Sequence, residues 1–309
     1  MRTNKLLLTI AALLLLVAAA ASAGGTAEVT REGPTITVAS KAWTEQLILG
    51  NMLLEILRAE GYPVEDRTGL GESDVIRPAL HAGQVDMYWE YTGTTLLTLM
   101  EHDPVGDPDE AFDLVKAWDE ETNNVTWLDY APANNTYVIM MRQEDADQLG
   151  LETISDLADY INQNPEAISF GTNDEFYERQ DGIRGLEELY GFEFDPDGVR
   201  FMTTGLTYGA LREGQVDAAV GFGTDGRIPA FDFVTLEDDK QYFPVYNPAP
   251  VVRMEVVQAY PELSDLIEEI SALLDGETLA GLNQRVDIDE EEPEDVALAF
   301  LREQGLIEF

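Results

Sequence analysis

A seven-residue pattern, Leu-x-x-Gly-Gln-Val-Asp, occurs twice in this chain, once in each half. The first copy spans Leu80–Asp86 and the second spans Leu211–Asp217. In each copy a glycine that can end a helix precedes a short apolar stretch typical of a strand, and an aromatic residue follows the Asp by five positions (Tyr91, Phe222). The repeat predicts two similar α/β lobes, each with an aromatic residue at a strand end, where open α/β sheets bind ligands. The alternative is a chance recurrence in which both rings belong to the core.

The charge of the chain excludes several classes of partner. It has 18 Lys and Arg against 60 Asp and Glu, a formal net charge of −42. Such a surface repels nucleic acid and anionic lipid, so we expect neither as a partner. The acids are spread along the chain, and a hydrophobic content of 45% still permits a packed core. We therefore expect an acidic, halophilic protein that folds best in high salt, which screens the repulsion between its charges.

The scarcity of cysteine and histidine limits the chemistry. The chain has no Cys, which excludes disulfides, thiol catalysis and thiolate metal sites, and it has only two His. We expect no metal and no cofactor. The sequence also lacks a glycine-rich phosphate loop, so an enzyme of this sequence could use only carboxylates as catalytic groups. Pairs of acidic residues are expected by chance at this composition and do not by themselves indicate an active site. A carboxylate-based hydrolase is thus a remote alternative, and the prediction is that the chain is not an enzyme.

The first 23 residues have the pattern of a secretory signal peptide. Arg2 and Lys5 precede an apolar run over residues 6–21, and the small residues 21–23 offer a cleavage site before Gly24. The run is shorter than the roughly 20 apolar residues that cross a bilayer. Residues 24–33 would then form a polar linker. We expect a mature protein secreted across the cytoplasmic membrane, in a periplasmic or extracytoplasmic location.

Strand and helix patterns alternate after the linker. In the first half we expect strands over 35–40 and 64–68, a helix that begins with Thr44 as its N-cap, and a second helix capped by Ser73 or Asp74. Together with the first repeat they form a β-α-β-α-β unit, which is typical of a parallel sheet flanked by helices.

The second half repeats this organisation. Strands are expected over 168–171 and 199–202, a helix over about 182–190, and the second repeat completes the unit. Residues 134–142 indicate a crossover into the second lobe, and a strand over 251–257 would lie back in the first. We therefore expect lobe 1 to comprise residues 34–133 and 244–309, and lobe 2 residues 134–243. The last part of the chain is expected to be helical over 263–274, 278–286 and 293–304.

Six short motifs occur in the order in which one family has them. They are Ser40-Lys-x-x-Thr-Glu-Gln46, Glu90-Tyr-Thr-Gly-Thr94, Asn135-Thr-Tyr137, Glu175-Phe-x-x-Arg179, Thr224-Asp-Gly226, and Leu236-x-Asp-Asp-Lys240 with Phe243-Pro-x-Tyr246. Through them residues 35–309 resemble the substrate-binding proteins of osmoprotectant ABC importers, the ProX/OpuBC-type binders of glycine betaine and choline.

The resemblance implies a two-lobed periplasmic-binding-protein fold of type II, in which each lobe is a mostly parallel sheet and the ligand lies in a cleft between the lobes. It implies hinge closure around the ligand. It also implies a membrane permease and its ATPase as partners, and we expect the protein itself to be a monomer.

The resemblance further implies a set of site residues. The trimethylammonium head would lie in a box of rings formed by Tyr91, Tyr137, Phe222 and Tyr246, with Tyr208 and Tyr242 as neighbouring alternatives. The carboxylate end would fall to Lys41, Thr94 and Arg179, with Asn135 and Glu175 lining the site. Phe222 stands where a tyrosine is common, and Ala42 replaces a frequent asparagine; both changes could alter which ammonium compound fits best.

The physical chemistry of such a ligand agrees with these residue types. A quaternary ammonium has no N–H, whereas an aromatic face attracts it by about 0.5–2 kcal/mol. Arg179 offers a bidentate fork to a carboxylate. Simpler roles remain open for three of these residues. Tyr137 could serve only in core packing, Lys41 could serve only to solvate the first helical turn, and Arg179 could form an ion pair with Glu175 or Glu178. Glycine betaine is the expected ligand, with choline and proline betaine close to it. An amino acid or another zwitterion is the alternative.

Overall fold

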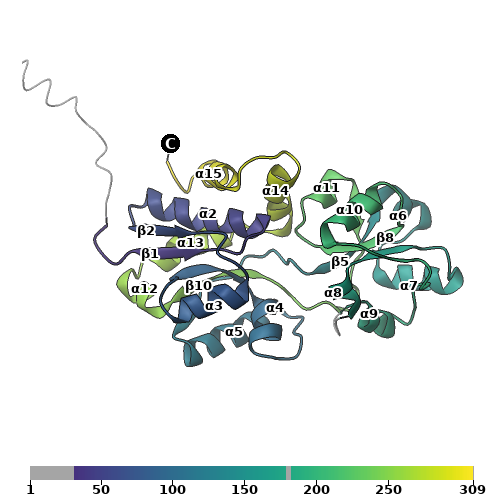
Figure 1. Cartoon of the computed structure of the whole chain (residues 1–309), viewed down its shortest axis with the longest axis horizontal. Helices are drawn as coiled ribbons and strands as arrows, with labels where there is room; N and C mark the ends of the chain where they lie inside the picture. The colour runs from purple at the N-terminus through teal and green to yellow at the C-terminus, as the bar shows by residue number, and fades with distance from the viewer. Residues whose placement is uncertain (1–30, 179–181, 309) are drawn as a thin grey trace, which may run out of the picture.

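The computed structural model describes residues 31–178 and 182–308, except for the side chains of Glu175 and Thr204. The predicted signal peptide lies outside the described residues. Figure 1 shows two α/β lobes side by side, joined by extended segments. Each lobe contains one five-stranded sheet, so the predicted two-lobed α/β fold is confirmed.

The two sheets have the same topology. The first has the order β2-β1-β3-β10-β4, and β10 runs antiparallel to both of its neighbours while β1, β2 and β3 are parallel. The second has the order β7-β6-β8-β5-β9, with β5 in the equivalent antiparallel position. The strands are β1 (Ile36–Ala39), β2 (Val64–Arg67), β3 (Met87–Tyr91), β4 (Val125–Trp127), β5 (Tyr137–Arg142), β6 (Phe170–Thr172), β7 (Val199–Phe201), β8 (Ala218–Phe222), β9 (Phe233–Thr235) and β10 (Pro248–Arg253).

The sequence repeat has a structural role in both sheets. Each repeat glycine, Gly83 or Gly214, has a φ of 69°, which an L side chain adopts only with strain. The repeat aspartates then join neighbouring parallel strands. Asp86 Oδ2 accepts from the Thr37 amide at 2.8 Å, and Asp217 Oδ2 accepts from the Ser169 amide at 2.9 Å. The repeat therefore fixes the central strand of each lobe against its parallel neighbour.

Helices cover both faces of each sheet. On the first sheet, residues of α2, α13, α14 and α15 share one buried cluster, and residues of α3 and α5 share another on the opposite face. The first lobe has α2 (Thr44–Ala59), α3 (Ser73–His81), α4 (Thr92–Thr94), the π-helical turn η1 (Thr95–Leu99), α5 (Pro108–Thr122), α12 (Met254–Ala259), α13 (Leu263–Ser271), α14 (Gly276–Asp287) and α15 (Pro293–Glu303). The second lobe has α6 (Gln143–Leu149), α7 (Ile154–Gln163), α8 (Asp174–Glu178), α9 (Ile183–Tyr190), α10 (Thr204–Arg212) and α11 (Arg227–Ala230).

Two predicted helix caps are wrong: Thr44 by one residue, and Ser73 or Asp74 by one or two residues. Helix α2 begins at Thr44 and its N-cap is Trp43, while α3 begins at Ser73 and its N-cap is Glu72. Neither cap residue makes a side-chain cap hydrogen bond. The Thr44 hydroxyl instead donates to Asp287 at 2.6 Å and the Ser73 hydroxyl to Glu90 at 2.7 Å, so both hydroxyls serve tertiary contacts.

The expected strand over 251–257 is also wrong in its bounds. Strand β10 starts earlier, at Pro248, and ends at Arg253, and α12 begins at the next residue, Met254. The amide of Met254 donates to the Asn124 carbonyl, and the guanidinium of Arg253 pairs with Asp86. Within the described ranges, no helix is long and apolar enough to cross a bilayer.

Candidate ligand-binding cleft

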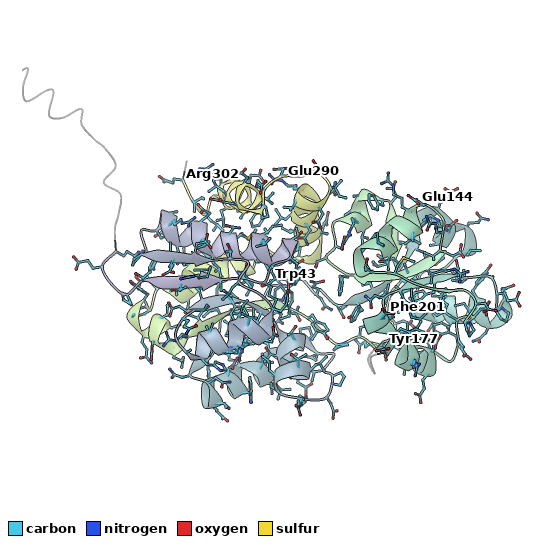
Figure 2. The ribbon with its side chains drawn as sticks, viewed as in Figure 1. Trp43, Glu144, Tyr177, Phe201, Glu290 and Arg302 are labelled. Atoms are coloured by element: carbon cyan, nitrogen blue, oxygen red, sulfur yellow. The ribbon has the colours of Figure 1, made fainter. Side chains whose placement is uncertain are left out.

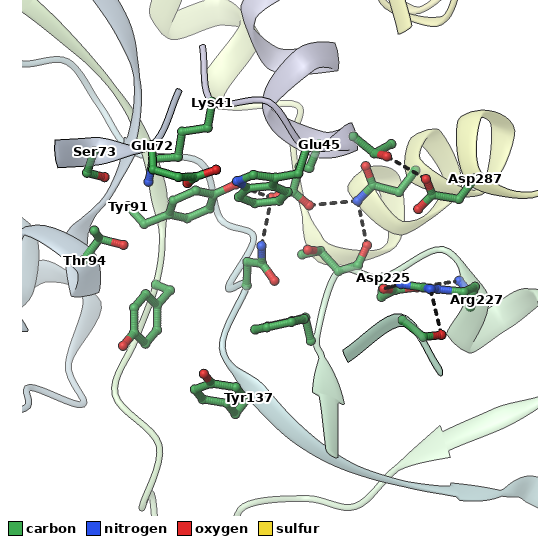
Figure 3. Close-up of a pocket in the computed structure, with 18 of the residues that line it drawn as sticks. Lys41, Glu45, Glu72, Ser73, Tyr91, Thr94, Tyr137, Asp225, Arg227 and Asp287 are labelled. Carbon is green, nitrogen blue, oxygen red and sulfur yellow. Dashed lines mark hydrogen bonds and ion pairs between the residues drawn. The ribbon is translucent and has the colours of Figure 1, made fainter. Parts of the chain in front are cut away.

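A cleft of about 1040 Å³ lies between the two lobes (Figure 3). Both sheets direct strand ends into it: Tyr91 is the last residue of β3 and Phe222 the last residue of β8. This follows from the repeat, since the carboxyl ends of parallel strands meet at one edge of each sheet. Residues of both lobes and of both crossovers line the cleft: Lys41, Trp43, Thr44, Glu45, Glu72, Ser73, Asp74, Tyr91, Thr94, Thr98, Asn135, Tyr137, Gly205, Phe222, Thr224, Asp225, Arg227, Tyr246, Asn283 and Asp287.

Seven of the nine predicted site residues are therefore brought together. They are Lys41, Tyr91, Thr94, Asn135, Tyr137, Phe222 and Tyr246. The other two, Arg179 and the side chain of Glu175, lie outside the described residues. Tyr208 and Tyr242, the two neighbouring alternatives, do not line the cleft. Tyr208 is buried and its hydroxyl accepts from the Phe222 amide at 3.0 Å, whereas the Tyr242 hydroxyl donates to the Gly182 carbonyl at 2.7 Å.

The rings in the cleft form one stacked pair in each lobe. In the first lobe Trp43 stacks on Tyr91, with ring centroids 5.6 Å apart and planes 18° apart. In the second lobe Tyr137 stacks on Phe222, with centroids 5.2 Å apart and planes 29° apart. Trp43, labelled near the junction of the two lobes in Figure 2, was not predicted as a site residue. It is 36% exposed in a protein that buries most of its large apolar residues. The cleft thus has an aromatic surface on each side.

A fifth ring reaches the cleft from the crossover between β9 and β10. A Cβ at Gly93 would lie 2.7 Å from the Tyr246 ring and 2.6 Å from the Val245 carbonyl oxygen. Only glycine lets this crossover approach the end of β3 so closely. The glycine of the Glu90–Thr94 motif therefore serves to place Tyr246 beside the first lobe.

Lys41 is an ion-pair partner inside the wall of the cleft. Its Nζ lies 2.6 Å from Glu90 Oε1 and 5.2 Å from the centroid of the Tyr91 ring. Glu90 also accepts from the hydroxyls of Ser73 and Tyr88 and from the amide of Tyr91. Burial raises the pKa of Glu90, but Lys41 and these donors together bring it below its usual value. Lys41 is therefore held as an ion-pair partner of Glu90 and does more than solvate a helical turn.

Arg227 is a second cation of the cleft, and the sequence did not indicate it. Its Nε lies 2.8 Å from Asp225 Oδ1 and its Nη2 lies 2.5 Å from Asp225 Oδ2, a bidentate pair. The guanidinium carbon lies 4.0 Å from the centroid of the Tyr208 ring. Asp225 belongs to the motif Thr224-Asp-Gly226 and Arg227 follows that motif directly, so the sequence motif marked this segment without indicating the role of Arg227.

Glu45 lies in the cleft wall with its side chain buried. Oε1 accepts from the Tyr91 hydroxyl at 2.6 Å and from Asn135 Nδ2 at 3.2 Å, and Oε2 accepts from Asn283 Nδ2 at 2.8 Å. Burial raises the pKa of this carboxyl, while hydrogen bonds from Thr224, Tyr91 and Asn283 oppose the rise. Glu45 belongs to the recognised motif Ser40–Gln46, but its role depends on partners that are distant in the sequence.

The two lobes touch directly beside Glu45. Asn283 Nδ2, on α14, also donates to the Thr224 carbonyl of the second lobe at 2.8 Å. A Cβ at Gly226 would lie 2.2 Å from the amide nitrogen of Gln284, so α14 packs against this loop without space for a side chain. We call Asn283, Gln284, Thr224 and Gly226 the interlobe contact. Figure 1 shows α14 beside α11, at the side of the second lobe.

The arrangement suits recognition of a cationic, methyl-rich group. Rings supply apolar and cation-attracting faces, and both described cations of the cleft are already paired with carboxylates. No group of three or more His, Asp or Glu side chains is placed to hold a metal ion in the part of the chain that the structure describes.

Comparison with known proteins finds relatives that match nearly the whole chain. Residues 34–303 match the model of the substrate binding domain of ABC-type glycine betaine transport systems. The chain is 40% identical over 282 residues to a glycine-betaine-binding protein of Pseudomonas aeruginosa, covering 90% of each. It is 33% identical over 277 residues to the glycine betaine-binding protein YehZ of Escherichia coli, covering 87% of this chain and 90% of that one.

A solved structure is similar in fold and sequence. The crystal structure described as a glycine betaine/carnitine/choline ABC transporter superposes with a TM-score of 0.83 at 30% identity, covering 88% of this chain and all of that one.

Proposed function

The chain belongs to the family of substrate-binding domains of ABC-type glycine betaine transport systems, and from this we propose that it binds a quaternary ammonium osmoprotectant for import. It is a binding protein and not an enzyme, as its relatives are. We infer glycine betaine as the ligand, with choline and proline betaine as further ligands. The names of its relatives mention glycine betaine, carnitine and choline, which supports the first two of these ligands.

The observation that carries the proposal is the pair of aromatic surfaces on the two sides of one cleft. The stack of Trp43 on Tyr91 belongs to the first lobe and the stack of Tyr137 on Phe222 to the second. A trimethylammonium group held between them would contact ring faces from both lobes, at about 0.5–2 kcal/mol for each face. Approach of the lobes would therefore be favoured by the ligand itself, which is the basis of hinge closure.

Each predicted site residue has a proposed role. The rings of Tyr91, Tyr137, Phe222 and Tyr246 contact the methyl groups, and Asn135 and Glu175 line the site. The carboxylate of a betaine would be held by Thr94 and Arg179, and Lys41 would contribute its positive charge from the wall of the cleft. Because Lys41 is paired with Glu90, the larger part of this task falls to Arg179.

The setting of the protein follows from the same family. We propose that residues 1–23 direct export, that 24–33 are a linker, and that a monomer in the periplasmic or extracytoplasmic space delivers its ligand to a membrane permease driven by an ATPase. The lobes in this proposal are 34–133 with 244–309, and 134–243, the latter closing onto the former.

A ligand panel tests the proposal. Isothermal titration calorimetry with glycine betaine, choline, carnitine, proline and histidine should give micromolar binding for methylated ammonium compounds and none for histidine. Binding of histidine or proline alone would contradict it, because an amino acid needs acceptors for the N–H groups of its ammonium. Arg179→Ala should weaken glycine betaine by about 1.5–3 kcal/mol and choline hardly at all, because choline ends in a neutral hydroxyl.

A further inference from the structure

Glu45 is a buried carboxylate without a cationic partner among the described residues. Its side chain belongs to a residue that is 1% exposed, and it forms no ion pair with any Lys, Arg or His of residues 31–178 and 182–308. The two cations of the cleft wall are held by other acids, Lys41 by Glu90 and Arg227 by Asp225. A buried charge is costly unless another charge compensates it.

Each hydrogen bond that reaches Glu45 is donated to it, which suits an ionised carboxylate. The side-chain NH₂ groups of Asn135 and Asn283 donate, and so does the Tyr91 hydroxyl, which lies 2.6 Å from Oε1. Neutral donors of this kind reduce the desolvation cost without cancelling the charge. When Glu45 is ionised, its charge therefore remains available to a cation that enters the cleft.

Tyr91 connects this charge to the ligand. Its ring lines the cleft while its hydroxyl donates to Glu45, so the carboxylate lies at the far end of the ring. A phenol that donates to a carboxylate is polarised and its ring gains electron density, which strengthens its attraction for a cation. In Figure 3 Glu45 and Tyr91 lie beside each other on the same side of the cleft.

We propose that Glu45 determines the charge selectivity of this site: its carboxylate, acting directly and through the Tyr91 ring, supplies the counter-charge for the ligand's quaternary ammonium. This rests on the proposed function and extends it. A ligand that is a net cation, such as choline, gains the full attraction. A zwitterion such as glycine betaine gains less, because its own carboxylate is repelled by the same charge.

Glu45→Gln tests the proposal, since it removes the charge and keeps the size. Titration calorimetry with choline and glycine betaine should show choline weakened roughly tenfold or more and glycine betaine weakened less, so that the ratio of the two dissociation constants shifts towards glycine betaine. Glu45→Asp keeps the charge and should largely keep the wild-type ratio. Asp74→Asn is the matched control, because Asp74 lines the cleft but is exposed, and it should leave the ratio nearly unchanged.

The possible outcomes separate this inference from the proposed function. An unchanged ratio in Glu45→Gln, or equal weakening of both ligands, would overturn the role of Glu45 while leaving the function intact. A shift as large in Asp74→Asn would also overturn it, since any nearby acid would then suffice. If the wild-type protein binds no methylated ammonium compound, the proposed function itself fails. Should Glu45→Gln not fold, the ratio measured for Glu45→Asp decides, and a large shift there would contradict the proposal.

Discussion

Lys41 Nζ lies 2.6 Å from Glu90 Oε1, and the two side chains are 5% and 0% exposed. Glu90 belongs to β3 and Lys41 follows β1, so the pair joins two parallel strands at the edge where the cleft opens. A buried pair of this kind contributes little over a hydrophobic replacement of both residues, but the loss of one partner leaves a buried charge.

Lys41→Met should therefore lower the free energy of unfolding by about 3–5 kcal/mol at neutral pH. Because Lys41 lowers the pKa of Glu90, the stabilisation is present above the unfolded pKa of 4.5 and is lost as the pH falls through the lowered value. The deficit of the variant should thus shrink in acid, as measured by urea unfolding at several pH values. Lys240→Met is the control, at an exposed position where the ammonium contacts the Tyr190 ring and the Leu189 carbonyl, and it should change stability by about 1 kcal/mol or less. Equal stability of the two variants would contradict a buried pair.

The rings of the two tyrosines that stack in the cleft should provide affinity for the ligand. Tyr91→Ala and Tyr137→Ala should each weaken ligand binding by about 1–3 kcal/mol, because a ring face is lost. Tyr137→Phe keeps the ring and should bind nearly as the wild type does. Tyr91→Phe removes the donor at 2.6 Å from Glu45 and should cost about 1.5–3 kcal/mol of folding stability. Calorimetry and thermal unfolding check these expectations, and wild-type affinity in both alanine variants would exclude the aromatic site.

The interlobe contact can be disturbed at Gly226, a residue that does not itself line the cleft. At Gly226 an added methyl group would meet the backbone of Gln284 at 2.2 Å, so Gly226→Ala must displace α14 or the loop. We expect weaker ligand binding and an altered radius of gyration in small-angle scattering. Gly209→Ala is the matched control: its Cβ would meet nothing within 4 Å, and alanine should stabilise helix α10 by about 0.5–1 kcal/mol. Identical scattering of Gly226→Ala and the wild type would show that the contact adapts.

The sequence predicted those features of the fold that depend on residues close together in the chain. The repeat could be recognised because a glycine with positive φ and an aspartate that holds a neighbouring strand must recur wherever the same βα unit recurs. Tyr91 and Phe222 then follow as strand ends. The strand order was also within reach, since the alternation of strands and helices restricts an open sheet to few topologies.

The features that sequence reasoning missed depend on residues far apart in the chain. Asn283 reaches Glu45 across 238 positions, and Thr44 reaches Asp287 across 243, so the Thr44 hydroxyl is used for a tertiary contact and not for its helix cap. Trp43 could not be distinguished from a core residue before its stacking partner was known. A hydroxyl or a ring offers the same local chemistry to several partners, and only the tertiary fold selects one.

The acidic surface should make folding depend on salt. With 60 acidic against 18 basic residues, repulsion destabilises the compact state unless it is screened. Raising NaCl from about 0.1 M to about 1 M shortens the Debye length from about 10 Å to about 3 Å, and the urea midpoint should rise across that range. Sucrose at matched osmolarity, which is excluded from the surface but does not screen, should raise it less. A urea midpoint that does not depend on salt would show that repulsion between the acidic side chains does not destabilise the folded state.

Glu45 should also make ligand binding depend on pH. Burial raises the pKa of this carboxyl above its usual value, and a bound cation stabilises the ionised form and so lowers the pKa again. The affinity for choline should consequently fall as the pH drops through the raised pKa, by up to about tenfold per pH unit, while Glu45→Gln should lack this component. Choline suits the measurement because it has no titrating group in this range.

The other groups that face Glu45 do not explain such a dependence. The pKa of the Tyr91 phenol is raised far above 10, because the ring is buried beside Glu45, and it stays neutral. The charge of Asp225 adds to the rise in the pKa of Glu45, but Asp225 is paired with Arg227, and Lys41 is paired with Glu90. Glu72, Asp74 and Asp287 line the same cleft and are exposed, and Asp74→Asn and Asp287→Asn measure the share of such exposed acids. Calorimetry of choline between about pH 5 and pH 8 should therefore show a slope in the wild type and in both asparagine variants, but a smaller one in Glu45→Gln. Equal slopes in all four proteins would mean that Glu45 does not carry the charge that the ligand meets.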